Sequence, residues 1–100
     1  MPTPALNDDE IRQRLARLEG WQREGDTIVK NYRTDSYLAG IALATAIGVI
    51  SEGLDHHPEL TIGWRRLRVS YCTHDAGNRL SHKDFDAAER VDALGYPPGS

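Results

Sequence analysis

Cysteine is almost absent from this chain of 100 residues, and Cys72 is its single representative. One cysteine cannot form an intramolecular disulfide, and no CxxC pair is present to hold a metal ion. A small chain without such links gains its stability from packing or from assembly with other subunits. We therefore expect a protein of a reducing compartment, the cytoplasm.

The sequence also lacks a large excess of charge of either sign. Its 12 Lys and Arg residues are set against 15 Asp and Glu residues, which gives a formal net charge of −3. Broad phosphate neutralisation needs a basic surface, so we expect no direct nucleic-acid partner. The most apolar stretch, residues 37–50, is interrupted by Gly40, Thr45 and Gly48 and is shorter than the ~20 residues of a membrane helix. The N-terminal segment also lacks the basic region followed by an apolar stretch that is typical of a signal peptide. We therefore expect neither a membrane span nor a signal peptide.

Periodic patterns predict three helices and four strands in the order α-β-β-α-β-β-α. Ser81 and Asp84 form a capping box that predicts the start of the last helix. Leu67, Val69 and Tyr71 alternate with polar residues, which is typical of a strand with one covered face. The predicted helices are residues 8–19, 36–53 and 81–94, and the predicted strands are residues 21–23, 27–33, 61–64 and 66–73.

These elements indicate an α+β fold, a four-stranded antiparallel sheet with three helices on one face. We expect residues 1–100 to form a single domain, with loose termini at residues 1–6 and 96–100. The middle helix, residues 36–53, is apolar almost all round, so a face remains after it has covered the sheet. We expect that face to contact another copy of the chain, in a homodimer or homotetramer.

All four histidines lie in the C-terminal half, and three of them lie at the ends of predicted elements. His56 and His57 occupy the turn after the middle helix, whereas His74 ends the last strand, and a compact sheet can bring these points together. Imidazole, with an unperturbed pKa of about 6.5, donates or accepts a proton near neutral pH. The three histidines therefore predict proton-transfer catalysis.

Metal binding and nucleophilic catalysis are the competing interpretations. Histidine and carboxylate bind zinc well, but adjacent side chains of an extended segment point apart and no HExxH motif is present. Cys72 lies in a predicted strand, where a buried apolar role is typical, and Ser70 and Ser81 lack the setting of a nucleophile. Neither GxGxxG nor GxxxxGK[ST] occurs, so no nucleotide cofactor is indicated. Metal remains the weaker hypothesis, and we expect no cofactor.

Several positions share the chemistry and spacing of one enzyme signature: Glu52, His56-His57-Pro58, Trp64, His74 and Asp84. The runs at 55–59 and 73–77 are close to that signature's most characteristic stretches. In these features the chain resembles the pterin-4a-carbinolamine dehydratases, also known as dimerisation cofactors of a homeodomain transcription factor. The resemblance covers most of residues 10–94.

The resemblance implies removal of water from 4a-hydroxytetrahydrobiopterin, which gives quinonoid dihydropterin in the recycling of tetrahydrobiopterin, without metal or cofactor. Such a reaction needs a general acid and a general base together. An aromatic amino-acid hydroxylase is then a possible partner in the same pathway. Carried over by position, the catalytic candidates are His56, His57 and His74, with His57 and His74 the preferred pair and the acid and base not distinguished. The substrate-binding candidates are Glu52, Asp55, Thr73, Asp75 and Asp84, the last of which is equally a predicted helix cap.

Two positions depart from the family pattern, and one histidine matches no position in it. The loop after His74 is one residue longer and has Asn78 where a second glycine is common, although asparagine tolerates left-handed backbone. Thr34 stands where an aromatic residue is frequent, so packing there is uncertain, and His82 is interpreted as a surface residue. The alternative function is non-catalytic protein binding or transcriptional co-regulation, with residues 36–53 as the interface.

Overall fold

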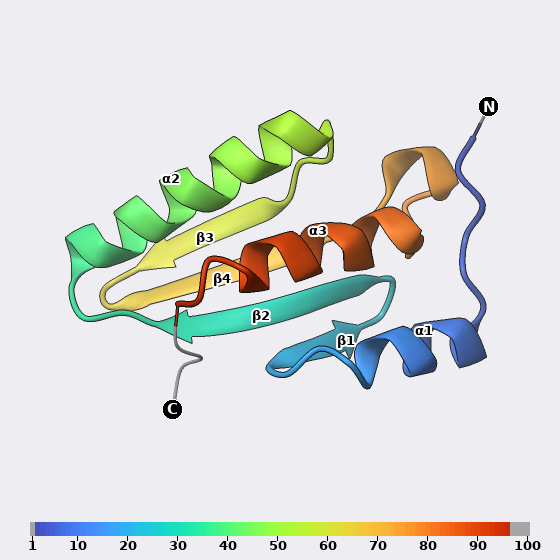
Figure 1. Cartoon of the computed structure of the whole chain (residues 1–100), viewed down its shortest axis with the longest axis horizontal. Coiled ribbons are helices and arrows are strands. Elements are labelled where there is room, and N and C mark those ends of the chain that lie inside the picture. Colours follow the sequence, from blue (N-terminus) through green and yellow to red (C-terminus); the bar gives the residue numbers. More distant parts are fainter. Residues whose placement is uncertain (1, 97–100) are drawn as a thin grey trace.

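The chain alternates single helices with pairs of strands, and a computed structural model describes residues 2–96 of it. The predicted order α-β-β-α-β-β-α and the α+β class are confirmed. Of the segment 96–100 that is predicted to be loose, Tyr96 packs against the core, which corrects the prediction there, and residues 97–100 lie outside the described residues. The elements are α1 (Asp8–Leu15), β1 (Trp21–Glu24), β2 (Thr27–Arg33), α2 (Tyr37–Leu54), β3 (Glu59–Gly63), β4 (Arg66–Tyr71), a short 3-10 helix η1 (His74–Ala76) and α3 (His82–Asp92) (Figure 1).

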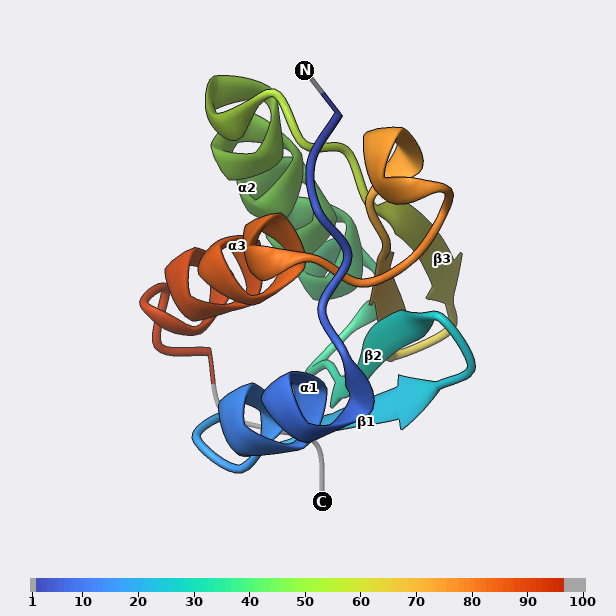
Figure 2. The same cartoon turned by 90° about the vertical axis from the view of Figure 1, so that its right-hand side faces the viewer.

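The four strands form one antiparallel sheet in the order β1-β2-β4-β3. In β4, Tyr71 is opposite Ile28 of β2, and Val69 is opposite Leu60 of β3. The helices lie on one side of this sheet (Figure 2). The alternation predicted for β4 is confirmed, since Leu67, Val69 and Tyr71 are all buried. The core therefore lies between the sheet and the helices, and β4 runs through its middle.

Helix α3 packs into this core through small residues and one large aromatic ring. Its capping box of Ser81 and Asp84 fixes where it begins, as the sequence predicts. Ala87 and Ala88 are completely buried and allow the helix to approach its neighbours closely. The ring of Phe85, also completely buried, fills the space between the helix and these neighbours. The packing of α3 against the core therefore depends on dense contacts around Phe85.

Several predicted element ends differ from the structure: β3 begins at Glu59 and α3 ends at Asp92, two residues from their predicted ends, and the ends of β4 and α1 differ as well. Strand β4 ends at Tyr71, so Cys72 lies beyond it and is half-buried, where the sequence predicts a buried strand residue. The backbone turns there because the Thr73 N–H donates to the Arg79 carbonyl at 2.9 Å. Helix α1 ends at Leu15, and residues 16–20 form turns in place of the predicted extension to residue 19.

The described part of the N-terminal segment is not loose, which corrects the prediction for residues 1–6. Thr3 is buried, with 8% of its surface exposed, and its hydroxyl donates to Asp75. The Leu6 N–H donates to the Leu80 carbonyl at 2.9 Å, and the Leu6 side chain packs against the core. Residues 2–6 are therefore attached to the body of the protein.

Helix α2 covers the sheet with one face and leaves an apolar face uncovered by this chain. Ile47 is fully buried, whereas Leu38 is 73% and Val49 69% exposed. By length and composition alone, α2 is also apolar enough to cross a membrane. Just before it, Thr34 is buried and donates a hydrogen bond to the Ser36 carbonyl at 3.0 Å, so the small residue is accommodated without an aromatic ring.

Replacing Phe85 by alanine tests the core. Phe85→Ala removes a fully buried ring and should lower the free energy of unfolding by about 3–5 kcal/mol in urea titrations. Arg90→Ala, on the exposed side of the same helix, should change it by less than about 0.5 kcal/mol. Equal effects of the two variants would contradict this packing.

Candidate active site

The C-terminal end of α2 determines where His56 and His57 lie. Asp55 caps the helix in left-handed backbone, with φ 52° and ψ 43°. Its N–H donates to the Glu52 carbonyl at 3.1 Å, and the His56 N–H donates to the Ser51 carbonyl at 3.0 Å. These bonds satisfy the last carbonyls of the helix and turn the chain toward β3. The two histidines therefore follow directly from a fixed helix end.

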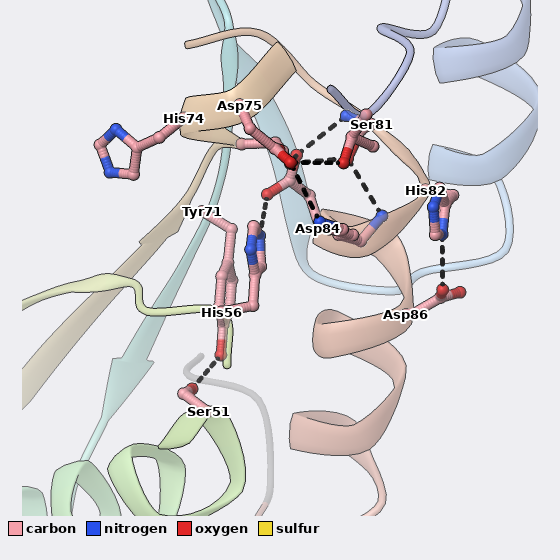
Figure 3. Close-up of polar contacts among 12 residues, drawn as sticks. Ser51, His56, Tyr71, His74, Asp75, Ser81, His82, Asp84 and Asp86 are labelled. Carbon is pink, nitrogen blue, oxygen red and sulfur yellow. Dashed lines mark hydrogen bonds and ion pairs between the residues drawn. The ribbon is translucent and has the colours of Figure 1, made fainter. Parts of the chain in front are cut away.

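His56 points into the protein, where Asp84 binds it (Figure 3). His56 Nε2 lies 2.6 Å from Asp84 Oδ1, and both side chains are buried. The other carboxylate oxygen, Oδ2, accepts from the Thr73 hydroxyl at 2.8 Å and from the Ser81 N–H at 3.0 Å. The Thr73 and Ser81 hydroxyls lie 2.6 Å apart. Asp84 thus caps α3, as predicted, and also anchors His56.

Tyr71 fixes the ring plane of His56. The two rings are nearly parallel, with an interplanar angle of 6° and centroids 5.7 Å apart. The Tyr71 hydroxyl lies 2.7 Å from Ser51 Oγ in the last turns of α2. Burial raises the pKa of Tyr71, which keeps the phenol neutral. His56 is therefore held both at Nε2 and on its face.

The hydrogen bond to Asp84 determines which tautomer neutral His56 adopts. A carboxylate only accepts hydrogen bonds, so the proton of neutral His56 lies on Nε2 and faces Asp84. Nδ1 is then the unprotonated nitrogen. Within residues 2–96, no buried side-chain nitrogen or oxygen lacks a hydrogen-bond partner, so the network around Asp84 is complete.

His57 and His74 are exposed. His57 Nε2 lies 2.6 Å from Glu52 Oε1, with side chains 58% and 78% exposed. His74 Nδ1 lies 2.8 Å from Asn78 Oδ1. The loop after α2 and the 3-10 helix η1 lie at the same end of the sheet in both views (Figures 1 and 2). Among the described residues no hydrogen bond joins His57 to His74, so each faces solvent from its own support.

The remaining predicted carboxylates lie at the rim of this region. Asp55 is exposed at the end of α2. Asp75 is exposed and accepts from Thr3 Oγ1 at 2.9 Å and from Lys83 Nζ at 3.4 Å. The Thr3 hydrogen bond, with help from Lys83, lowers the pKa of Asp75. Across residues 2–96, no three His, Cys, Asp or Glu side chains gather as metal ligands would.

His82 and Asn78 agree with the predictions from the sequence. His82 is exposed on α3 and pairs with Asp86 at 3.1 Å, away from the network of His56. Asn78 has φ 59°, the left-handed backbone that asparagine tolerates.

Four supporting residues are missed by the sequence analysis: Ser51, Tyr71, Asn78 and Thr3. The alternation of β4 does predict that Tyr71 points inward, but it gives no sign of the ring stacking on His56.

Comparisons with known proteins identify the family of the chain. A family profile described as "Pterin 4 alpha carbinolamine dehydratase" matches residues 4–94. The chain belongs to the pterin-4a-carbinolamine dehydratase family. A relative from Natronomonas pharaonis, provisionally named a pterin-4-alpha-carbinolamine dehydratase, is 48% identical over 89% of this chain and 94% of its own length. A relative from Streptomyces coelicolor with the same provisional name is 34% identical over 100% of this chain and 99% of its own length.

Solved structures show that the dehydratase fold is shared. A transcriptional coactivator/pterin dehydratase from Brucella melitensis has a TM-score of 0.84, at 24% identity, over 92% of this chain and 99% of that one. A pterin dehydratase-like protein identified as a RuBisCO assembly factor in the alpha-carboxysome has a TM-score of 0.59, at 22% identity, over 80% of this chain and 89% of that one. The fold of the family therefore extends beyond proteins described only as dehydratases.

Removing the Asp84 carboxylate should destabilise this family member strongly. Asp84→Ala leaves the Thr73 hydroxyl, the Ser81 N–H and the His56 ring without their buried acceptor, so we expect a loss of about 3 kcal/mol in urea unfolding. Asp86→Ala, an exposed aspartate on the same helix, should cost less than about 1 kcal/mol. A loss at Asp84 as small as that at Asp86 would refute the anchoring role.

Proposed function

We propose that this protein removes water from 4a-hydroxytetrahydrobiopterin by histidine general acid–base catalysis and releases quinonoid dihydropterin. Family membership supports the substrate class and the type of reaction. The observation that supports histidine catalysis is the placement of three imidazoles at one end of the sheet. One of them is buried and the other two are exposed to solvent. His56 is buried against Asp84, while His57 and His74 are accessible to a ligand.

The dehydration requires two proton movements. The C–O bond at position 4a breaks, and a proton must reach the departing hydroxyl so that it leaves as water. A ring N–H loses its proton, and its electron pair forms the new C=N bond. Atoms and charge balance without a redox partner. A general acid and a general base on either side of a planar ring are therefore sufficient.

In this proposal His57 and His74 perform the proton transfers, and His56 assists them from a fixed position. The Glu52 carboxylate, whose Oε1 lies 2.6 Å from His57 Nε2, orients that ring. Asn78 holds His74 by its Nδ1 atom. Asp55 and Asp75 provide exposed polar groups beside the histidines, whereas Thr73 and Asp84 are buried and act through His56.

The proposal places the protein in the cytoplasm. There an aromatic amino-acid hydroxylase would supply the hydroxylated pterin and tetrahydrobiopterin would be recycled. The reducing environment suits a chain whose one cysteine has its pKa raised by partial burial.

Histidine variants test the catalytic assignment. His57→Ala and His74→Ala should each lower kcat/KM for a chemically generated 4a-hydroxytetrahydropterin by roughly 10²- to 10⁴-fold, because each removes a proton-transfer group. The release of quinonoid dihydropterin is followed by absorbance.

The matched control is His82→Ala, which removes an exposed histidine from α3 and should leave the rate unchanged. A chelator should also leave the wild-type rate unchanged. Wild-type rates from both site variants would refute histidine catalysis, and loss of activity with the chelator would favour the metal hypothesis.

The exposed face of α2 supports assembly into a homodimer or homotetramer. Leu38 and Val49 are more than two-thirds exposed on a helix whose single charged residue is Glu52, near its C-terminal end. Burying such side chains removes apolar surface from water, which favours association. A second copy, with the same apolar helix, is the proposed partner.

Light scattering tests this assembly. The wild type should be an oligomer, whereas Leu38→Glu combined with Val49→Glu should be monomeric, because the two charges would be buried at the interface. Leu94→Glu, at a 43% exposed apolar residue just beyond α3, should keep the oligomer. A monomeric wild type, or an unchanged mass for the double variant, would contradict the proposed interface.

Protein binding without catalysis remains the second candidate, and the same apolar face of α2 favours it. The pterin dehydratase-like RuBisCO assembly factor shows that a related fold has such a role in another protein. The two candidates differ in the histidine assay, since a pure binding protein would release no water from the substrate. A stoichiometric partner together with absent activity would favour the binding role.

A further inference from the structure

The N-terminal segment, residues 2–6, crosses the body of the protein beside the loop that carries His74 (Figure 2). Thr3 Oγ1 donates to Asp75 Oδ2 at 2.9 Å, and Asp75 directly follows His74. At the other end of the loop, the Leu6 N–H donates to the Leu80 carbonyl at 2.9 Å. The segment therefore holds the loop at both of its ends.

The segment is attached to the protein at two separate points, because it is not packed along its whole length. Thr3 is buried at one end, and Leu6 packs against the core at the other. Ala5, which lies between these two ends, lines a cavity of about 360 Å³ together with Leu6 and Leu80. Restraint of the loop therefore depends on two hydrogen bonds and one apolar side chain.

The backbone of the loop turns through two consecutive left-handed residues. Gly77 and Asn78 have φ 73° and φ 59°, a region that glycine and asparagine tolerate better than other residues. Asn78 also provides the hydrogen bond that orients His74. A shift of the loop would therefore move both His74 and its supporting amide.

We propose that Thr3 is a positioning residue, which acts through Asp75 to hold the loop in the conformation that presents His74 to the substrate. This role rests on the proposed dehydratase function, and Thr3 itself does not touch the reacting atoms. The family profile begins at residue 4, so Thr3 lies just outside the matched segment. The restraint is therefore a feature of this chain beyond the family's matched residues.

Three variants test the role of the Thr3 hydroxyl. Thr3→Val keeps the shape but removes the donor to Asp75, whereas Thr3→Ser keeps the donor. Thr27→Val is the matched control, because it removes a hydroxyl that donates to the Glu24 carbonyl in the turn between β1 and β2. All three are studied in the full-length chain by NMR, urea unfolding and the dehydration assay.

Hydrogen exchange reports the loop directly. The Ala76 and Gly77 amides, which donate to the Thr73 and His74 carbonyls, should exchange about fivefold to tenfold faster in Thr3→Val. The pKa of Asp75 should rise toward its ordinary value, because the Thr3 hydrogen bond is the main cause of its lowering. Thr3→Ser and Thr27→Val should match the wild type in both measurements.

Activity tests the link to His74. Thr3→Val should lower kcat about fivefold with little change in KM, and Thr3→Ser should restore it. The ionised Asp75 carboxylate accepts from Thr3 and Lys83 more strongly than the protonated acid does, so in the wild type the restraint is strongest above the lowered pKa of Asp75 and weakens as pH falls through it.

Each result decides a separate claim. Unchanged amide exchange in Thr3→Val would overturn the restraint, and faster exchange with unchanged kcat would overturn the positioning of His74. A wild type without dehydratase activity would refute the proposed function, while the exchange and Asp75 measurements would still decide whether Thr3 restrains the loop.

Discussion

The buried hydrogen bond between Asp84 and His56 is the interaction on which the rest of the site depends. One carboxylate begins α3, receives the Thr73 hydroxyl beyond β4 and holds the imidazole beyond α2. Three segments that are distant in the sequence thus end at a single side chain. A buried carboxylate without partners would be strongly unfavourable, so all of these contacts must form together. The geometry of the site is therefore coupled to folding of the whole chain.

This coupling separates the three histidines into two kinds. His56 is fixed by Asp84 and by the parallel ring of Tyr71, whereas His57 extends from the loop after α2 and His74 from η1. A chain of 100 residues has one modest core and little depth for a cleft. A planar substrate needs only a shallow site, in which exposed imidazoles can approach it while a buried one keeps the backbone in place.

The sequence predicts what local patterns determine and misses what distant contacts determine. The alternation of Leu67, Val69 and Tyr71 predicts a covered strand, because period-2 burial is a local property. The capping role of Asp84 is predicted from Ser81 nearby, but its bond to His56 spans 28 residues and leaves no local signal. Likewise nothing near Thr3 indicates a partner 72 residues away, which is why the N-terminus is predicted wrongly as loose.

Helix α2 connects the proposed site with the proposed subunit interface. Its outward face carries exposed apolar side chains, while Ser51 in its last turns binds the Tyr71 hydroxyl and its end determines the position of His56. A rotation of α2 about its axis would therefore change the support of both rings. A second copy that packs on the outward face would oppose such a rotation. Assembly would therefore hold in place the same helix that supports the histidine site. Oligomerisation in this chain is then expected to stabilise the site without contributing a residue to it.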